Sequence, residues 1–401
     1  MQTDRGDKDW QIQNMANIYK ESHSCVVLLG GVGGLGGVNE TTQWINRSWT
    51  LQEALLPRSV YCIFEWTKGP GSLNGGCLRS LIDINGPYGV LSLGEMIAYS
   101  LSKTRFAPFL EPFSGDKYAE TGPEELVTFL PMFANSREAP LSLTNALTKS
   151  YFLHMREDER ENMGGKFEEL ESSIWRCAMM RTSVRDRDAV FSIMGLFGVQ
   201  LDPAQYRTQR EALIALLQKS MEIGRKATWL AASIKSPSLI PLLPTSKIQE
   251  IPSVQTSQNI IEARLLTENL VWYLSNAPNG VLDETGALTI VAPVSPVNVT
   301  EISETTEKYL GFHFAGKIEE SKIFLSGSAG SYAVKLGKVA LISSPAVARF
   351  VFMQDSLIML LEPKGEKWRK VGMAAIPTEI SEGWEERALV IIGNEDGHLY
   401  D

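Results

Sequence analysis

The chain has 401 residues, of which 44% are hydrophobic and 21% are charged, and its formal net charge is −9 at pH 7. This length allows two or three domains around a sizeable core, and the composition is typical of a globular protein. The acidic balance and the absence of a polybasic run disfavour nucleic acid or an anionic membrane surface as a partner.

Predicted helices and strands alternate along the first part of the chain. Apolar residues recur at helical spacing over 9–22, and the apolar run 25–29 predicts a buried strand. A second helix is expected over 46–57, which begins at a capping asparagine and stops at a proline, and a second strand over 59–64. This alternation predicts a parallel α/β layer, which we assign to residues 1–78.

The character of the sequence changes twice after this part. Residues 79–235 are expected to be mainly helical, and 166–181 is the clearest amphipathic helix. The stretch 236–252 contains four prolines and predicts a boundary. The C-terminal part, 236–401, contains short strand-like runs separated by turn residues, which predict a β-sandwich or a barrel-like domain.

A glycine-rich stretch follows the first predicted strand and contains the pattern G-x-G-x-x-G at Gly31, Gly33 and Gly36. In dinucleotide-binding proteins, such glycines let backbone N–H groups approach a pyrophosphate at a helix N-terminus. Two features disfavour a Rossmann-type oxidoreductase. Gly37 would destabilise the first turn of the following helix, and the repeated strand–helix units of that fold do not follow. We therefore favour a surface loop over this weak cofactor-binding site.

Two segments carry longer motifs. DKDWQIQNMANIYKESHSCVVLLG, followed by WINRSWTLQEALLP, contains an acidic start, a Q-x-x-x-M-x-x-I-Y helix, an apolar strand and an R-x-W-x-x-Q-E helix. In 181–203 an aspartate precedes a short helical run that ends in Gly-Leu. Both segments resemble the heterokaryon-incompatibility (HET) domain of filamentous fungi. The residues that match the first motif are Asp9, Gln11, Met15, Ile18, Tyr19, Arg47, Trp49, Gln52 and Glu53.

HET domains are similar to TIR domains, so the resemblance implies an incomplete TIR-like, flavodoxin-like α/β fold. Some TIR domains cleave NAD with a glutamate on a helix of the S-x-W-C-x-x-E type. The matching position here is Glu53. The resemblance therefore implies NAD as a substrate, Glu53 as the catalytic carboxylate, and Arg47, Ser48, Trp49 and Gln52 as substrate-binding residues.

The residues themselves leave the role of the Trp49–Glu53 pair open. The two residues are four positions apart, so they share one face of a helix. A carboxylate beside an indole could hold ribose hydroxyls and stabilise an oxocarbenium-like transition state. The alternative is structural, with Trp49 in the core and Glu53 at the boundary, paired with an arginine or a backbone N–H.

The family's two upstream segments, Y-x-x-L-S-Y-x-W-G and W-I-D-x-x-C-I-x-Q, do not precede the motif in this sequence. The resemblance assigns them to the sheet centre and to one wall of the nucleotide pocket, so we expect NAD cleavage to be slow or absent. Two function classes follow. One is a self/non-self recognition or cell-death protein that acts through homo-oligomers, a protein partner or residual NAD cleavage. The other is a small-molecule enzyme of specialised metabolism with a remodelled, cofactor-free pocket.

The remaining sequence features concern location and metals. No segment reaches the roughly 20 apolar residues that span a bilayer, and the N-terminus lacks the apolar region of a signal peptide. We expect a cytoplasmic protein with no membrane partner. The cysteines at 25, 62, 77 and 177 and the four histidines are widely spaced, so the sequence predicts neither disulfides nor a metal site.

Overall fold

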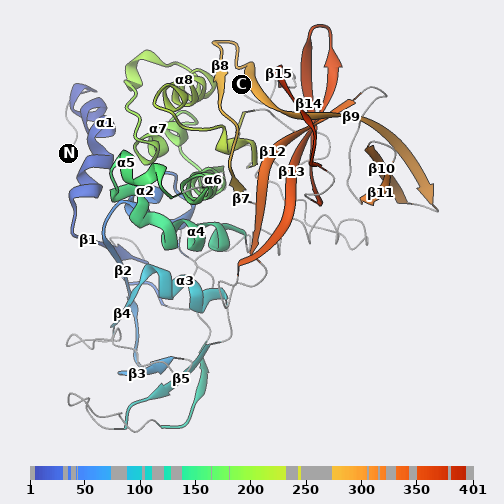
Figure 1. Cartoon of the computed structure of the whole chain (residues 1–401). Helices are drawn as coiled ribbons and strands as arrows, with labels where there is room; N and C mark the ends of the chain where they lie inside the picture. The colour runs from blue at the N-terminus through green and yellow to red at the C-terminus, as the bar shows by residue number, and fades with distance from the viewer. Residues whose placement is uncertain are drawn as a thin grey trace.

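The computed structural model describes residues 5–29, 35–37, 42, 44–73, 88–101, 104–110, 122–127, 138–163, 165–179, 181–231, 243–244, 273–304, 307–314, 317–321, 331–342, 350–377 and 381–393. These residues form a mixed α/β protein. The helices lie above the N-terminal strands in the view of Figure 1 and beside the C-terminal strands.

The N-terminal part alternates helices and strands as the sequence predicts. Its elements are α1 (Arg5–Glu21), β1 (Ser24–Leu28), the 3-10 turn η1 (Trp44–Asn46), α2 (Thr50–Leu55) and β2 (Ser59–Glu65). Strands β1 and β2 are parallel, and β4 (Tyr88–Ser92) pairs antiparallel with the other edge of β2. The sheet order among the described strands is therefore β1-β2-β4.

The second helix is shorter than the expected 46–57. It begins at Thr50, and Asn46 lies in the preceding 3-10 turn instead of capping it. The reason is a long-range contact. Arg47 forms an isolated parallel bridge with Thr182, and the Thr182 N–H donates to the Asn46 carbonyl at 2.7 Å. This bridge removes residues 46 and 47 from the helix.

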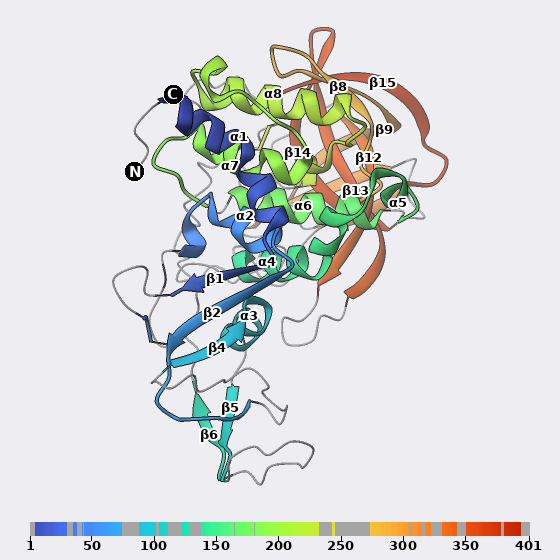
Figure 2. The same cartoon turned by 90° about the vertical axis from the view of Figure 1, so that its left-hand side faces the viewer.

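The region 79–235, expected to be mainly helical, also contains strands. Besides β4, it holds β5 (Thr104–Pro108) and β6 (Glu125–Val127), which form a small antiparallel sheet with β3 (Gly71–Leu73). Helix α3 (Leu93–Leu101) follows β4 directly. Because β4 is bonded to β2, the N-terminal sheet extends past the expected limit at residue 78. Figure 2 shows the small sheet below β4.

The rest of this region is helical, as expected. Its elements are α4 (Glu138–Lys149), η2 (Ser150–His154), α5 (Glu157–Glu161), α6 (Lys166–Met179), α7 (Asp188–Met194), η3 (Gly195–Phe197), η4 (Pro203–Gln205), α8 (Gln209–Glu222) and η5 (Thr228–Ala231). Helix α6 is buried along nearly its whole length, including its charged residues after Lys166. The expected amphipathic helix 166–181 is therefore enclosed on all sides.

The C-terminal part is β-rich. Its strands are β7 (Tyr273–Ser275), β8 (Gly280–Leu282), β9 (Leu288–Glu304), β10 (Glu307–Phe314), β11 (Lys317–Ser321), β12 (Ser331–Ile342), β13 (Phe350–Lys364), β14 (Lys367–Pro377) and β15 (Glu385–Ile392). The sheet order is β11-β10-β9-β15-β14-β13-β12-β7, and β8 also pairs with β9. Because β9 pairs with β12 as well, strands β9, β15, β14, β13 and β12 close into a ring.

The long strands explain a difference from the sequence prediction. Several expected short strands join into continuous ones, and β12 and β13 cover segments predicted as separate runs. Register shifts between Lys335 and Gly337 and between Val339 and Leu341 replace the expected turn within β12. Bulges of this kind bend a strand without ending it, which lets a few long strands close a barrel.

One hydrophobic core joins these parts. It runs from Val27 in β1 through α6 and α8 to Ile391 in β15. Helix α6 contacts β7, and α8 contacts β8. Among the described residues, we find no helix that is both long and apolar enough to cross a membrane.

Candidate functional site

The Glu53 carboxylate joins three elements of the N-terminal part. Its Oε1 accepts a hydrogen bond from the Tyr19 hydroxyl at 3.1 Å, and its Oε2 accepts one from the Trp44 indole N–H at 2.8 Å. Tyr19 belongs to α1, Trp44 to η1 and Glu53 to α2. Through these two hydrogen bonds the cluster holds the three elements together.

The tyrosine and the cysteine near Glu53 are neutral at neutral pH. Burial raises the pKa of the Tyr19 hydroxyl, and the charge of Glu53 and the hydrogen bond to it raise it further. Burial and then Glu53 also raise the pKa of the Cys25 thiol. Tyr19 therefore keeps its proton and donates a hydrogen bond to Glu53, and Cys25 is not an activated nucleophile.

A buried cation lies behind the start of α2. The Arg181 guanidinium donates from Nη1 to the Thr50 hydroxyl at 2.6 Å and to the Arg47 carbonyl at 3.2 Å. Burial lowers the pKa of Arg181 to about 10, although the nearby Cys177 and Glu53 act in the opposite direction. Arg181 thus stays charged at neutral pH and fixes the turn before α2.

The other residues that the resemblance assigned to substrate do not gather at Glu53. Arg47 is exposed, and its backbone is engaged with Thr182. The buried Ser48 donates its backbone N–H to the Thr182 carbonyl at 2.9 Å. Its hydroxyl has no hydrogen-bond partner in the described part of the chain. Trp49 is half-buried and packs against the hydrophobic core.

Gln52 points toward α7. Its side-chain nitrogen donates to the Ser192 carbonyl at 2.6 Å, and the residue is buried. Gln52 and Glu53 are adjacent in sequence and therefore face different neighbours: Gln52 faces the core, and Glu53 faces Tyr19 and Trp44. Of the five predicted residues, only Glu53 belongs to the cluster with Tyr19 and Trp44, while the other four pack in the core or, for Arg47, lie exposed.

The partners of Glu53, Tyr19 and Trp44, were not expected from the sequence. Tyr19 ends the Q-x-x-x-M-x-x-I-Y motif, and Trp44 opens the run WINRSW. Both were quoted for the resemblance but were given no role. The signal was present, since a Tyr or Trp with an apolar ring and one polar atom commonly bonds a carboxylate at a core boundary.

The glycine motif is described in part. Gly31 and Gly33 lie outside the described residues. Gly36 is buried, and its carbonyl accepts a hydrogen bond from the Glu65 N–H at 3.0 Å. Gly37 bridges Glu65 in the parallel sense. The end of the glycine stretch therefore continues alongside β2 beyond the end of β1.

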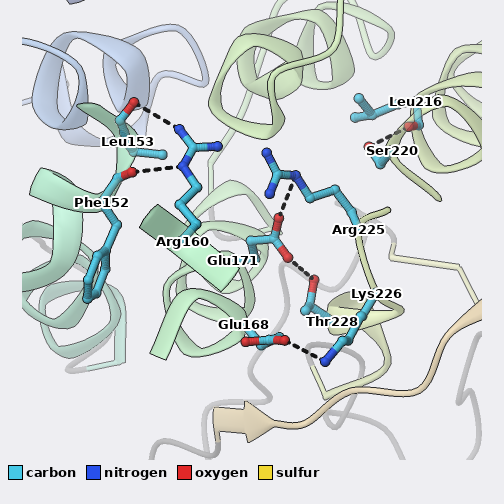
Figure 3. A network of polar contacts seen from close by, with 10 residues as sticks. All are labelled: Phe152, Leu153, Arg160, Glu168, Glu171, Leu216, Ser220, Arg225, Lys226 and Thr228. Carbon is cyan, nitrogen blue, oxygen red and sulfur yellow. Dashed lines mark hydrogen bonds and ion pairs between the residues drawn. The ribbon is translucent and has the colours of Figure 1, made fainter. Parts of the chain in front are cut away.

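A second cluster of charged residues surrounds helix α6 (Figure 3). The fully buried Glu171 lies 3.5 Å from Arg225 Nε, and it accepts a hydrogen bond from the Thr228 hydroxyl, also at 3.5 Å. Glu168 pairs with Lys226 at 2.8 Å. Burial raises the pKa of Glu171 to about 8, because its two long contacts do not replace the lost hydration.

The neighbouring arginine completes this network. Arg160 donates to the carbonyls of Phe152 and Leu153, both at 3.1 Å. The guanidinium carbons of Arg160 and Arg225 lie 4.9 and 4.7 Å from the centre of the Phe167 ring. This burial could not be predicted from the sequence, since the acidic residues of α6 match the polar face of an ordinary amphipathic helix.

The described residues contain no group of three or more metal-ligating side chains. Fold and clusters together define a mixed α/β protein in which a helical layer joins a small N-terminal sheet to a closed C-terminal barrel. No protein-family model, curated protein or solved structure matches the chain.

Proposed function

We propose that this chain is a HET-like self/non-self recognition or cell-death protein that works through association, and that Glu53 has a structural role in it. The resemblance to the HET motif supports the recognition or cell-death role, and the observation that carries the structural role of Glu53 is the pair of hydrogen bonds from Tyr19 and Trp44 to its two oxygens. Tyr19 and Glu53 are both residues of the HET-like motif. This contact supports the view that the motif describes a packing unit.

The neighbouring residues support the same role. A catalytic carboxylate requires substrate-binding groups preorganised around it. Ser48 is instead engaged with Thr182, and Gln52 with Ser192. Glu53 is thus surrounded by its own structural partners, while the residues that would position NAD contact other elements. NAD cleavage at Glu53 is the competing outcome of the test.

The test combines a cell assay with an enzyme assay. Induced expression of the chain in a filamentous fungus should reduce viability, and the purified protein should release no nicotinamide from NAD. The Glu53→Gln variant should be less stable, with an unchanged nicotinamide assay. Full viability after expression would refute the recognition or cell-death role.

Two variants separate the structural role from catalysis. Tyr19→Phe removes one hydrogen bond and leaves the carboxylate in place, so it should lower the unfolding free energy by about 0.5–1.5 kcal/mol. Glu65→Gln is the matched control, because Glu65 is an exposed carboxylate at the end of β2. Nicotinamide release that survives Glu65→Gln and is lost in Glu53→Gln would overturn the structural role.

A further inference from the structure

Among the described strands, β1 lies at one end of the N-terminal sheet, and one side of its backbone faces away from β2. The Leu29 N–H donates to the Ile63 carbonyl at 3.4 Å, which fixes the phase of the parallel ladder. Backbone groups of successive residues in a strand alternate in direction. Those of Cys25 and Val27 therefore face β2, and those of Ser24, Val26 and Leu28 face outward.

The same outward-facing residues carry exposed side chains. Val26 is 54% exposed and Leu28 is 40% exposed, and Tyr61, the partner of Val26 in β2, is 40% exposed. On the opposite face of the sheet, Val27 and Cys62 are buried. Parallel strands are normally covered on both faces, so an exposed apolar face is unusual for the parallel pair β1 and β2.

Nothing in the sequence of β1 protects its edge. The strand reads SCVVL, with no charge, no proline and an unbroken register against β2. Proteins commonly guard an exposed edge with lysine, proline or a bulge, because a bare edge pairs with other strands. An uncharged edge beside an exposed apolar face has the properties of an interface.

We infer that two copies of this chain associate through β1, which pairs antiparallel with its own copy about a two-fold axis at Val26. In this register Val26 lies opposite Val26 of the second copy, and Ser24 lies opposite Leu28. All three outward-facing residues then exchange hydrogen bonds with the second copy. The two three-stranded sheets join into one sheet of six strands.

A second copy is the occupant because the strand is complementary to itself. A two-fold interface places the same patch on both subunits, so a charged residue near the axis would lie opposite an identical charge and be repelled by it. All five residues of β1 are uncharged, and the symmetric register leaves none of them unpaired. The exposed face also continues across the axis, since Val26 and Leu28 have their side chains on the same side of the joined sheet.

This inference rests on the proposed action through association, but its test is separate from the assays for Glu53. Disulfide cross-linking reads the register directly. In an antiparallel hydrogen-bonded pair, opposite Cα atoms are about 5.5 Å apart, within the range of a disulfide. Val26→Cys should therefore cross-link two copies under mild oxidation, as judged by non-reducing electrophoresis.

Leu28→Cys is the matched control on the same strand and face. In the proposed register the two Leu28 positions are separated by four residue steps, about 14 Å, which is too far for a disulfide. The wild-type protein controls for the native cysteines. The double variant Ser24→Cys with Leu28→Cys should cross-link, because these two positions are opposite each other. Equal cross-linking of Val26→Cys and Leu28→Cys would refute the register.

Sedimentation tests the association itself. The wild-type chain should sediment as a dimer, and Val26→Lys should sediment as a monomer with an unchanged circular dichroism spectrum, because Val26 is exposed and two lysines would meet at the axis. A wild-type monomer would overturn the inference. So would a Val26→Lys dimer, or a complex that forms only with a different protein.

Discussion

Replacing Glu171 with glutamine should change how the stability of the protein depends on pH. Glu171 is fully buried in α6, and the charged and polar groups that face it are Arg225, Glu168, Thr228 and Arg160. Burial outweighs the attraction of Arg225 and raises the pKa of Glu171 from 4.5 to about 8. The folded protein therefore binds a proton at Glu171 over a pH range in which the unfolded chain has lost it.

The sign and size of the effect follow from this difference. Where the folded state binds more protons, the unfolding free energy falls as pH rises. The contribution of Glu171 is complete below its unfolded pKa of 4.5 and is lost as pH rises through about 8. Each pKa unit corresponds to about 1.36 kcal/mol, so the loss between about pH 5 and about pH 8 is up to about 3 kcal/mol.

Urea unfolding of the wild type and of Glu171→Gln at a series of pH values measures this effect. Glutamine has nearly the shape of the protonated acid and does not titrate, so the variant should gain stability relative to the wild type as pH rises. Glu168→Gln is the control, because it removes a carboxylate of the same helix that pairs with Lys226 at 2.8 Å. Parallel curves for the wild type and Glu171→Gln would refute the reasoning, as would the same relative gain in Glu168→Gln.

Four further substitutions test packing and burial. Trp49→Ala should lower the unfolding free energy measured in urea by about 2–4 kcal/mol. This cost does not exceed that of removing a fully buried tryptophan, because Trp49 is half-buried. An unchanged unfolding free energy would show that Trp49 does not pack in the core. Gly195→Ala should destabilise by about 1–3 kcal/mol, because its new methyl group would overlap the Ala16 side chain. Gly94→Ala, whose new methyl group would meet open space, should be neutral or stabilising in the same assay. Burial lowers the pKa of Lys370 to about 7, so the unfolding free energy should rise with pH above that value. Lys370→Met should therefore raise the melting temperature more at about pH 6 than at about pH 9. An equal rise at both pH values would contradict the burial effect.

The secondary structure of the N-terminal part could be predicted because its signals are local. Helix α1 and strands β1 and β2 lie within a few residues of the bounds expected from apolar spacing. The start of α2 could not be predicted, because it depends on the bridge between Arg47 and Thr182. The residues near Arg47 in the sequence do not indicate that its partner is Thr182.

The candidate site shows the same division. The sequence motif drew attention to Glu53, and the helix spacing placed it beside Trp49. The motif also assigned Ser48 and Gln52 to this site, but in the structure both residues are buried in the core. The partners of Glu53 come instead from α1 and η1, and Tyr19 is 34 positions away. A motif shows which residues occur together in a sequence, whereas only packing shows which of them touch.

The sequence by itself determined the order of helices and strands in the first 65 residues, the β-rich C-terminal part and the pattern of apolar residues that builds the core, because these depend on the spacing of neighbouring residues. Only the tertiary structure decided that β9 closes a ring by pairing with β12, that the acidic residues of α6 are enclosed, and that β1 is an end strand, with one face exposed, among the described strands of its sheet. Each of these depends on contacts between distant segments, whose free energy is gained only when the chain has folded and the entropy of closing the intervening loops has been overcome.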